Sequence, residues 1–183
     1  MTTDRPQLLT IGHGASDRVE LGDRLTAAGI ETLVDVRRFP GSRRNPDVGT
    51  DAMQEWVLEL DVQYVWDERL GGRRSLSKQA PATDAWWRVE QFRAYAAHTR
   101  TAPFLAAMDD LVELSSLGRT AIMCSENVWW RCHRRLIADV AVLAHDFSVW
   151  HVMPDGRTRA HDVSPTATVA GHHLLEWPQT DEN

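Results

Sequence analysis

The chain has 183 residues, of which 43% are hydrophobic and 25% are charged, and its formal net charge is −6 at pH 7. These values are typical of a soluble globular protein with one sizeable core. The negative charge argues against a general nucleic-acid coat protein, and no apolar run approaches the ~18 residues of a membrane helix. The first residues lack a signal-peptide core, so we expect a cytoplasmic protein with no membrane partner.

Apolar runs and helical patterns alternate along the chain. Strands are expected at 8–11, 32–36, 63–66, 120–123 and 147–153. Helices are expected from Ser16 or Asp17 to Gly29, at 51–60, 86–99 and 103–117, and after the second cysteine. This alternation predicts an α/β fold with three layers, a mostly parallel sheet with helices on both faces.

The chain is expected to form one such domain over residues 1–163. Residues 164–183 are polar, contain proline and include a His172–His173 pair. A segment of this composition is expected to be a loosely held C-terminal tail on the surface. The sequence predicts no role for the histidine pair and no oligomeric state.

Both cysteines, Cys124 and Cys132, lie in one segment. The apolar run 120–123 predicts a buried strand that ends at Cys124, and three- and four-residue apolar spacing predicts a helix after Cys132. The second thiol is therefore expected in or near the first helical turn, beside a strand end where open α/β sheets bind ligands. The helix N-terminus and nearby arginines, including Arg131 and Arg134, favour a thiolate.

Arginines gather in three places, while Lys78 is the only lysine among 20 Lys and Arg residues. A biased genome composition explains the shortage of lysine but not this clustering. Each cluster follows an expected strand, so the three should meet at one sheet edge and form a cleft for phosphate or carboxylate. The clusters are Arg37, Arg38, Arg43 and Arg44; Arg69, Arg73 and Arg74; and Arg131, Arg134 and Arg135.

Several motifs follow the expected strands in a distinctive order. They are Thr10-Ile-Gly-His13, Leu33-Val-Asp35-Val-Arg37, Leu70-Gly71-Gly72, Phe92-Arg93-Ala-Tyr95, and Cys124-Ser-Glu126 followed by Trp130-Arg131-Cys132-His133-Arg134. With these motifs the chain resembles the domain-of-unknown-function-488 family (DUF488) from about residue 8 to residue 161. Ser125 and Trp129 stand where the family usually has Ala and Pro, so the helix entry is expected to differ slightly. The resemblance implies no activity, because the family is uncharacterised.

Cys132 and His133 are the sharpest catalytic candidates. Cys132 is interpreted as a nucleophile or redox thiol, and His133 as a base or as a cation that lowers the thiol pKa. Adjacent residues of a helix point about 100° apart and need not touch, so Glu126 or His13 are alternative bases. The structural alternative is a buried cysteine that packs as a small apolar side chain.

Cys124 is the remaining catalytic candidate, and it could also pair with Cys132 in a disulfide or a metal site. A zinc site built from Cys124, Cys132, His133 and His161 is an alternative hypothesis. The Cys-x7-Cys-His spacing matches no standard zinc pattern, so neither a metal nor another cofactor is predicted.

A further set of residues is predicted to bind the ligand. These are His13, Asp35, Arg37, Arg43, Arg73, Arg131, Arg134 and Trp130. Flanking glycines let a ligand approach His13. Asp35 either orients an arginine or only pairs with one to order the loops. Trp130 either stacks a base or, as most tryptophans do, fills a core or a subunit contact.

Three hypotheses follow from these patterns. The first is a thiol-dependent enzyme that acts on a nucleotide or nucleic-acid end in an arginine-lined cleft. The second is a phosphate- or nucleic-acid-binding module without chemistry, and the third is a Cys/His metal or redox-sensor protein. All of them require one pocket surrounded by His13, Asp35, Arg37, Arg43, Arg73, Cys124, Glu126, Cys132 and His133.

Overall fold

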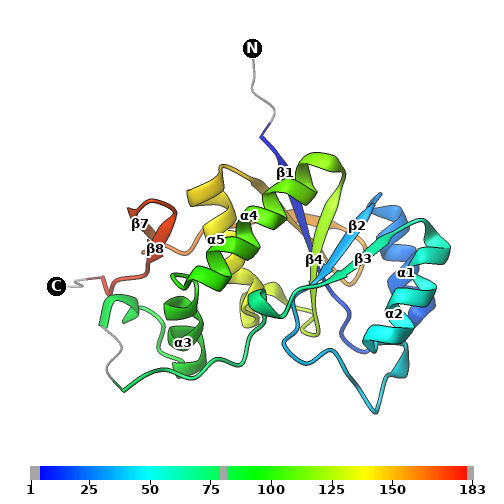
Figure 1. The fold of residues 1–183 in the computed structure, drawn as a ribbon, viewed down its shortest axis with the longest axis horizontal. Helices are drawn as coiled ribbons and strands as arrows, with labels where there is room; N and C mark the ends of the chain where they lie inside the picture. Colours follow the sequence, from blue (N-terminus) through cyan, green and yellow to red (C-terminus); the bar gives the residue numbers. More distant parts are fainter. Residues whose placement is uncertain (1–4, 79–81, 181–183) are drawn as a thin grey trace.

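A computed structural model describes residues 5–78 and 82–180 and has a six-stranded sheet at its centre (Figure 1). The strand order is β3-β2-β4-β1-β5-β6. The first five of these strands are parallel, and β6 is antiparallel to β5. The bounds are β1 Gln7–Gly12, β2 Thr32–Asp35, β3 Gln63–Trp66, β4 Thr120–Cys124, β5 Ser148–Val152 and β6 Thr158–Ala160. The prediction of a mostly parallel sheet is confirmed.

Helices cover both faces of the sheet, which confirms the predicted three layers (Figure 1). Helices α1 (Arg18–Ala27) and α2 (Thr50–Trp56) lie on one face, and α3 (Glu90–His98), α4 (Ala102–Leu117) and α5 (Arg134–His145) on the other. Short 3₁₀ helices span Pro46–Val48, Leu58–Leu60, Glu68–Leu70, Ala82–Asp84 and Trp129–Arg131. In the part of the chain that the structure describes, no helix has the length and apolarity needed to cross a bilayer.

Neighbouring residues of β1 enter different cores, because successive side chains of a strand point to opposite faces. Leu9 packs in the cluster that contains Leu21 of α1, whereas Leu8 packs in the cluster that contains Phe104 of α4. The parallel central strands are therefore buried on both sides, as their near-continuous apolar runs predict.

The ends of helix α1 follow local chemistry. The Asp17 carboxylate accepts hydrogen bonds from the backbone N–H groups of Val19 and Glu20, which have no partner inside the helix. Gly29 follows the helix with φ +63°, a conformation that side chains disfavour. Of the two expected N-caps, Ser16 and Asp17, the structure uses Asp17.

Two predicted helices are shorter than expected. The helix expected at 86–99 begins at Glu90, because Trp87 is buried in the core in a non-helical segment. The helix expected at 51–60 ends at Trp56 and gives way to a 3₁₀ turn, after which Asp61 takes φ 58°. Apolar spacing marks which residues are buried, and a tight turn buries them as well as a helix does.

The tail is packed rather than loosely held over residues 164–177. Strands β7 (Thr168–Gly171) and β8 (Leu174–Glu176) form a hairpin beside α5 (Figure 1), and Leu175 and Trp177 are buried. Burial of a large indole ring stabilises this arrangement, and its N–H has a hydrogen-bond partner in α5. Residues 181–183 lie outside the described part.

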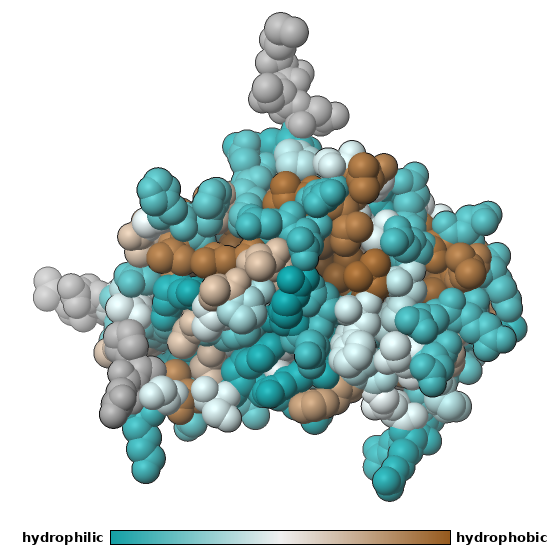
Figure 2. Space-filling view, in the orientation of Figure 1, coloured by the Kyte–Doolittle hydropathy of each residue, from teal (hydrophilic) through white to brown (hydrophobic). Residues whose placement is uncertain are grey.

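Strand register brings the functional loops to one edge of the sheet. Gly12 at the end of β1 pairs with Cys124 at the end of β4, and Asp35 at the end of β2 pairs with Met123. The loops after these strands lie in the lower half of Figure 1. In Figure 2 brown apolar patches cross the molecule at the level of α4 and β3, and the surface below them is mostly teal and white.

Candidate functional site

A pocket of about 830 Å³ lies at the carboxyl edge of the sheet. Eight of the predicted site residues line it: His13, Arg37, Arg73, Cys124, Glu126, Arg131, Cys132 and His133. Four do not line it: Asp35, Arg43, Arg134 and Trp130. The pocket also contains residues that sequence reasoning missed, among them Phe39, Arg44, Phe92 and Tyr95.

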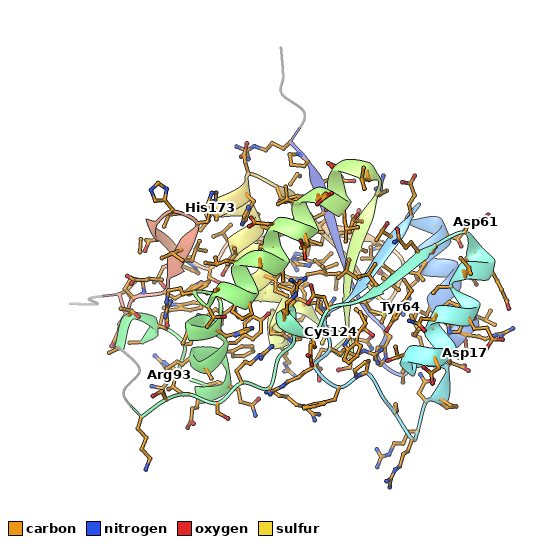
Figure 3. All side chains as sticks on the ribbon, viewed as in Figure 1. Asp17, Asp61, Tyr64, Arg93, Cys124 and His173 are labelled. Atoms are coloured by element: carbon orange, nitrogen blue, oxygen red, sulfur yellow. The ribbon has the colours of Figure 1, made fainter. Side chains whose placement is uncertain are left out.

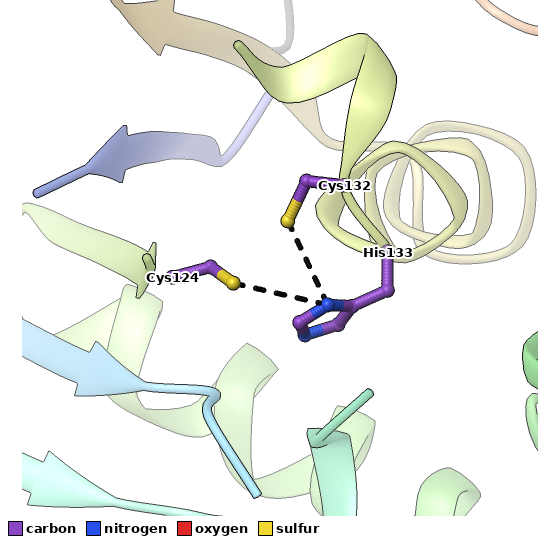
Figure 4. A group of neighbouring side chains, drawn as sticks. All are labelled: Cys124, Cys132 and His133. Carbon is purple, nitrogen blue, oxygen red and sulfur yellow. Dashed lines mark hydrogen bonds between the residues drawn. The ribbon is translucent and has the colours of Figure 1, made fainter. Parts of the chain in front are cut away.

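Two thiols and one imidazole of the pocket lining converge on one another (Figure 4). The Nδ1 atom of His133 lies 3.6 Å from Sγ of Cys132 and 3.9 Å from Sγ of Cys124. Cys132 has an extended backbone, with φ −128° and ψ 150°, and α5 begins only at Arg134. The adjacent side chains of Cys132 and His133 therefore touch, which two helical neighbours would not do.

The protonation of His133 follows from its other ring nitrogen. Nε2 lies 3.0 Å from the carbonyl oxygen of Val36, which can only accept a hydrogen bond. Nε2 therefore carries a proton, and in the neutral form of the ring the lone pair is on Nδ1, which faces both sulfurs. Gly72 gives the ring room, since a Cβ atom at that position would come within 2.8 Å of Nδ1.

Arg134 acts on Cys132 from inside the protein rather than from the pocket. Its backbone N–H and its Nε–H donate to Sγ of Cys132 at 3.5 and 3.4 Å, and the residue is only 1% exposed. Within residues 5–78 and 82–180, no carboxylate pairs with Arg134. Because an unpaired buried cation is costly, a thiolate at Cys132 is the natural counter-charge.

The two thiols titrate differently. Burial opposes the thiolate of Cys132, but the hydrogen bond from Cys124 and the charge of Arg134 outweigh it and lower the pKa of Cys132 to about 6. The hydrogen bond to Cys132, together with burial, raises the pKa of Cys124. The opposite directions of the two pKa shifts favour the thiolate at Cys132, the thiol that Arg134 contacts, over the thiolate at Cys124.

A buried hydrogen-bond chain continues from Arg134 through the core. Nη1 of Arg134 lies 3.4 Å from Oγ1 of Thr10, which lies 2.7 Å from Nδ1 of His151. Nε2 of His151 then meets Nδ1 of His161 at 3.0 Å, and Nε2 of His161 meets Asp139 at 2.8 Å. Arginine only donates and a carboxylate only accepts, so with both imidazoles neutral every hydrogen bond points toward Asp139. Burial, followed by the positive charge of Arg134, holds the pKa of His151 far below its usual value, so this imidazole is neutral.

Asp139 anchors this chain and joins it to the tail. Its carboxylate accepts from the backbone N–H of Ser164 at 3.0 Å and from Nε1 of Trp177 at 2.9 Å, and it is fully buried. Trp129 stacks on the His151 ring with centroids 4.1 Å apart. Sequence reasoning missed the network, although an acidic residue on the apolar face of α5 is a signal for it.

Asp35 does not line the pocket itself but contacts Arg37, which does. Its carboxylate accepts from Nε of Arg37 at 2.8 Å and from the Tyr64 hydroxyl at 2.6 Å, and all of these contacts are buried or half-buried. Arg37 also donates to the carbonyl oxygen of Val48 at 2.7 Å, which ties the end of β2 to the 3₁₀ helix Pro46–Val48 that precedes α2. Figure 3 shows Tyr64 on β3, to the right of Cys124.

His13 is held neutral in the first strand-to-helix turn. Burial, followed by the charge of Arg37, lowers its pKa to about 4. Its Nδ1 lies 2.9 Å from the carbonyl oxygen of Gly14 and therefore carries the proton, so Nε2 accepts from Arg37 at 3.2 Å. The lone pair that a base for Cys132 would need is thus already used.

The three arginine clusters meet only in part. Arg38, Arg44, Arg73 and Arg131 line the pocket together with Arg37. Arg69 instead pairs with Asp67 and Asp110 beside α4, and Arg74 donates to backbone carbonyl groups. Of the two neighbouring arginines in the loop after β2, Arg44 lines the pocket and Arg43 does not, and both are exposed.

Trp130 also lies outside the pocket. It is 40% exposed and packs edge-on against Trp129, which is buried beside the histidine chain. Trp129 is therefore part of the core and Trp130 lies at the surface, outside the pocket lining, so its ligand-binding role stays a prediction.

Fold and site together define an α/β protein with a thiol- and arginine-containing pocket at the carboxyl edge of its sheet. The family model described as "Domain of unknown function DUF488" matches residues 17–141. The chain belongs to this family, as the sequence motifs indicated. No curated protein and no solved structure matches the chain.

Proposed function

We propose that the pocket binds an anionic ligand that carries a phosphate or carboxylate group, and that Cys132 is the nucleophile of a reaction on that ligand. The observation that carries the proposal is the buried guanidinium of Arg134, which has no carboxylate partner in the described chain and donates to Sγ of Cys132. This arrangement stabilises a thiolate at the pocket floor, where the thiol is a pocket-lining group.

The pocket walls support the choice of an anionic ligand. Arg44, Arg73 and Arg131 line the pocket, and none of them pairs with a carboxylate among the described residues. Phe39, which is 64% exposed, adds an aromatic face on which a base could stack. A nucleotide or a nucleic-acid end has both of these features. Glu126 lines the same pocket and is the candidate for proton transfer.

The proposal is tested with two alkylating reagents that differ in charge. With iodoacetate or iodoacetamide, an S–C bond forms at Cys132 and iodide leaves. In chelator-treated, reduced protein at pH 7, we expect iodoacetate to react faster than iodoacetamide, with saturable kinetics and competition by inorganic phosphate. Peptide mass spectrometry identifies the modified thiol. Faster reaction of the neutral reagent would contradict the anion site, and modification only after unfolding would contradict the nucleophile.

The neighbouring residues Arg43 and Arg44 provide a matched pair of variants. Arg44→Ala is expected to slow iodoacetate alkylation of Cys132 by about tenfold, because a charge-assisted contact contributes ~1.5 kcal/mol. Arg43→Ala should leave the rate within about twofold, since Arg43 lies outside the pocket. The rates with iodoacetamide serve as the control, because they report the thiol without the anion contact. Equal effects of both variants on iodoacetate would show that only the general positive field matters.

The reaction should depend on pH through Cys132. Because the pKa of this thiol is lowered to about 6, the iodoacetamide rate should rise to a plateau near neutral pH. An ordinary free thiol, with a pKa of about 8.5, is still mostly protonated there. A rate that continues to rise above pH 8 would mean that Arg134 does not stabilise the thiolate.

A further inference from the structure

We propose that Cys124, Cys132 and His133 form a binding site for a thiophilic divalent cation, with Zn²⁺ as the best fit, and that one coordination position opens into the pocket. The site uses the same thiols as the proposed function and rests on it in one respect: the bound cation occupies the sulfur of Cys132 and masks its reaction. The cation would therefore act as a regulator of the thiol.

The geometry of the three atoms supports this site (Figure 4). Sγ of Cys124, Sγ of Cys132 and Nδ1 of His133 all lie within 4.8 Å of one another. The two S···N separations are 3.6 and 3.9 Å. In a tetrahedral zinc site with Zn–S of about 2.3 Å and Zn–N of about 2.0 Å, the S···N edge is about 3.5 Å. The two S···N edges need shifts of only a few tenths of an ångström, and the S···S edge, which lies within 4.8 Å here, would close to about 3.8 Å.

The surroundings orient each ligand atom as metal sites do. The carbonyl oxygen of Val36 accepts from Nε2 of His133, so the lone pair of Nδ1 faces the sulfurs before any cation binds. Two N–H groups of Arg134 point at Sγ of Cys132 and support a thiolate ligand. Sulfur ligands select Zn²⁺ over the hard cations Mg²⁺ and Ca²⁺.

The site has three protein ligands rather than four. His161, expected as a fourth ligand in the zinc hypothesis, is excluded because both of its nitrogens are bonded, to His151 and to Asp139. All three ligand residues line the pocket, so the fourth position faces the ligand space. Three protein ligands and one open position are typical of non-structural zinc sites.

Charge balance determines what occupies the open position. Binding of Zn²⁺ releases the proton of the Cys124 thiol, and two thiolates then neutralise the cation. The buried charge of Arg134 remains, so the loaded site has a net positive charge. An anion at the fourth position, either hydroxide or the anionic group of the pocket ligand, offsets it.

The test uses Co²⁺ as a spectroscopic substitute for Zn²⁺ in chelator-treated, reduced protein. We expect one equivalent of Co²⁺ to produce an intense near-ultraviolet thiolate-to-cobalt band and the strong visible bands of four-coordinate cobalt. Zn²⁺ should abolish these bands and also block alkylation of Cys132 by iodoacetamide. EDTA should restore alkylation.

Variants locate the site. Cys124→Ser and Cys132→Ser should each lose the cobalt bands while their far-ultraviolet circular dichroism stays native. His172→Ala is the matched control for adventitious binding at the exposed His172–His173 pair, and it should keep the bands. Bands that persist in Cys132→Ser would overturn the assignment of the ligands.

The two proposals fail in different ways. Absence of cobalt bands, together with rapid alkylation of Cys132, would overturn the metal site and leave the proposed function intact. Cobalt bands together with a slow Cys132 in metal-free protein would overturn the nucleophile and leave the metal site intact. Unchanged alkylation in the presence of bound Zn²⁺ would overturn the masking role.

Discussion

Replacement of Arg134 by methionine is expected to slow iodoacetamide alkylation of Cys132 at pH 7 by at least roughly thirtyfold. A thiol with a pKa of about 6 is mostly thiolate at this pH. A thiol at the free value of about 8.5 is only a few per cent ionised, and the burial of Cys132 would raise its pKa further. Methionine keeps most of the volume and removes the charge. The pH–rate profile in chelator-treated protein measures the effect.

Arg135→Met is the matched control for this prediction. Arg135 is the next residue of α5, but its guanidinium stacks on Trp86 and Trp87 rather than on a thiol. Its replacement should leave the midpoint of the Cys132 profile unchanged. If Arg134→Met and Arg135→Met gave the same profile, the thiolate would not depend on the buried cation.

Replacement of Asp139 by alanine is expected to lower the free energy of unfolding by about 3 kcal/mol or more. The change leaves three buried donors, from His161, Ser164 and Trp177, without their acceptor, and each such loss costs about 1–3 kcal/mol. Urea unfolding followed by circular dichroism measures the difference. Asp109→Ala, an exposed aspartate on α4, should change it by less than about 0.5 kcal/mol.

The same variant also tests whether the chain of hydrogen bonds reaches the thiol. Without the Asp139 carboxylate, no acceptor fixes the direction of the hydrogen bonds in the series. The Thr10 hydroxyl, which accepts from Arg134, is then no longer held to donate to His151. Alkylation of Cys132 should therefore slow under conditions in which the variant is still folded. An unchanged free energy of unfolding in Asp139→Ala would contradict the expected loss of stability. An unchanged alkylation rate would contradict the expected effect on Cys132.

The fold followed closely from the sequence because its central strands are buried on both faces. Continuous apolar runs mark such strands clearly, as in β4, which begins at the predicted Thr120, ends at Cys124 and is buried throughout. Helix starts were less certain, as the late start of α3 at Glu90 shows. Buried aromatic residues give the same apolar signal in a turn as in a helix.

The pocket was predictable as a place but not in its details. Parallel strands bring their carboxyl ends to one edge, so the meeting of Cys124, Cys132 and His133 near one another followed from chain order. Which of Arg43 and Arg44 lines the pocket depends on the conformation of an irregular loop. Such a loop has no periodic sequence pattern from which its conformation could be predicted. Sequence position likewise could not show that Arg134 acts from behind the thiol.

The tail is held by contacts between distant parts of the chain. The indole of Trp177 and the N–H of Ser164 donate to Asp139, and the backbone N–H of Trp177 donates to Asp84. A lone aromatic residue in a polar segment predicts no such packing. Burial of such a residue is decided by the groove that α5 and the core offer it. Tertiary structure alone contains that information.

The contact between Trp177 and Asp139 also sets an order of events during synthesis. Thr10 precedes Trp177 by most of the described chain, yet both belong to one connected network of hydrogen bonds. During synthesis the strands of the central sheet emerge before Trp177, so the anchoring of Asp139 cannot be complete until residue 177 has left the ribosome. Chains truncated shortly before residue 177 should therefore form the sheet but leave the Asp139 carboxylate without the indole donor.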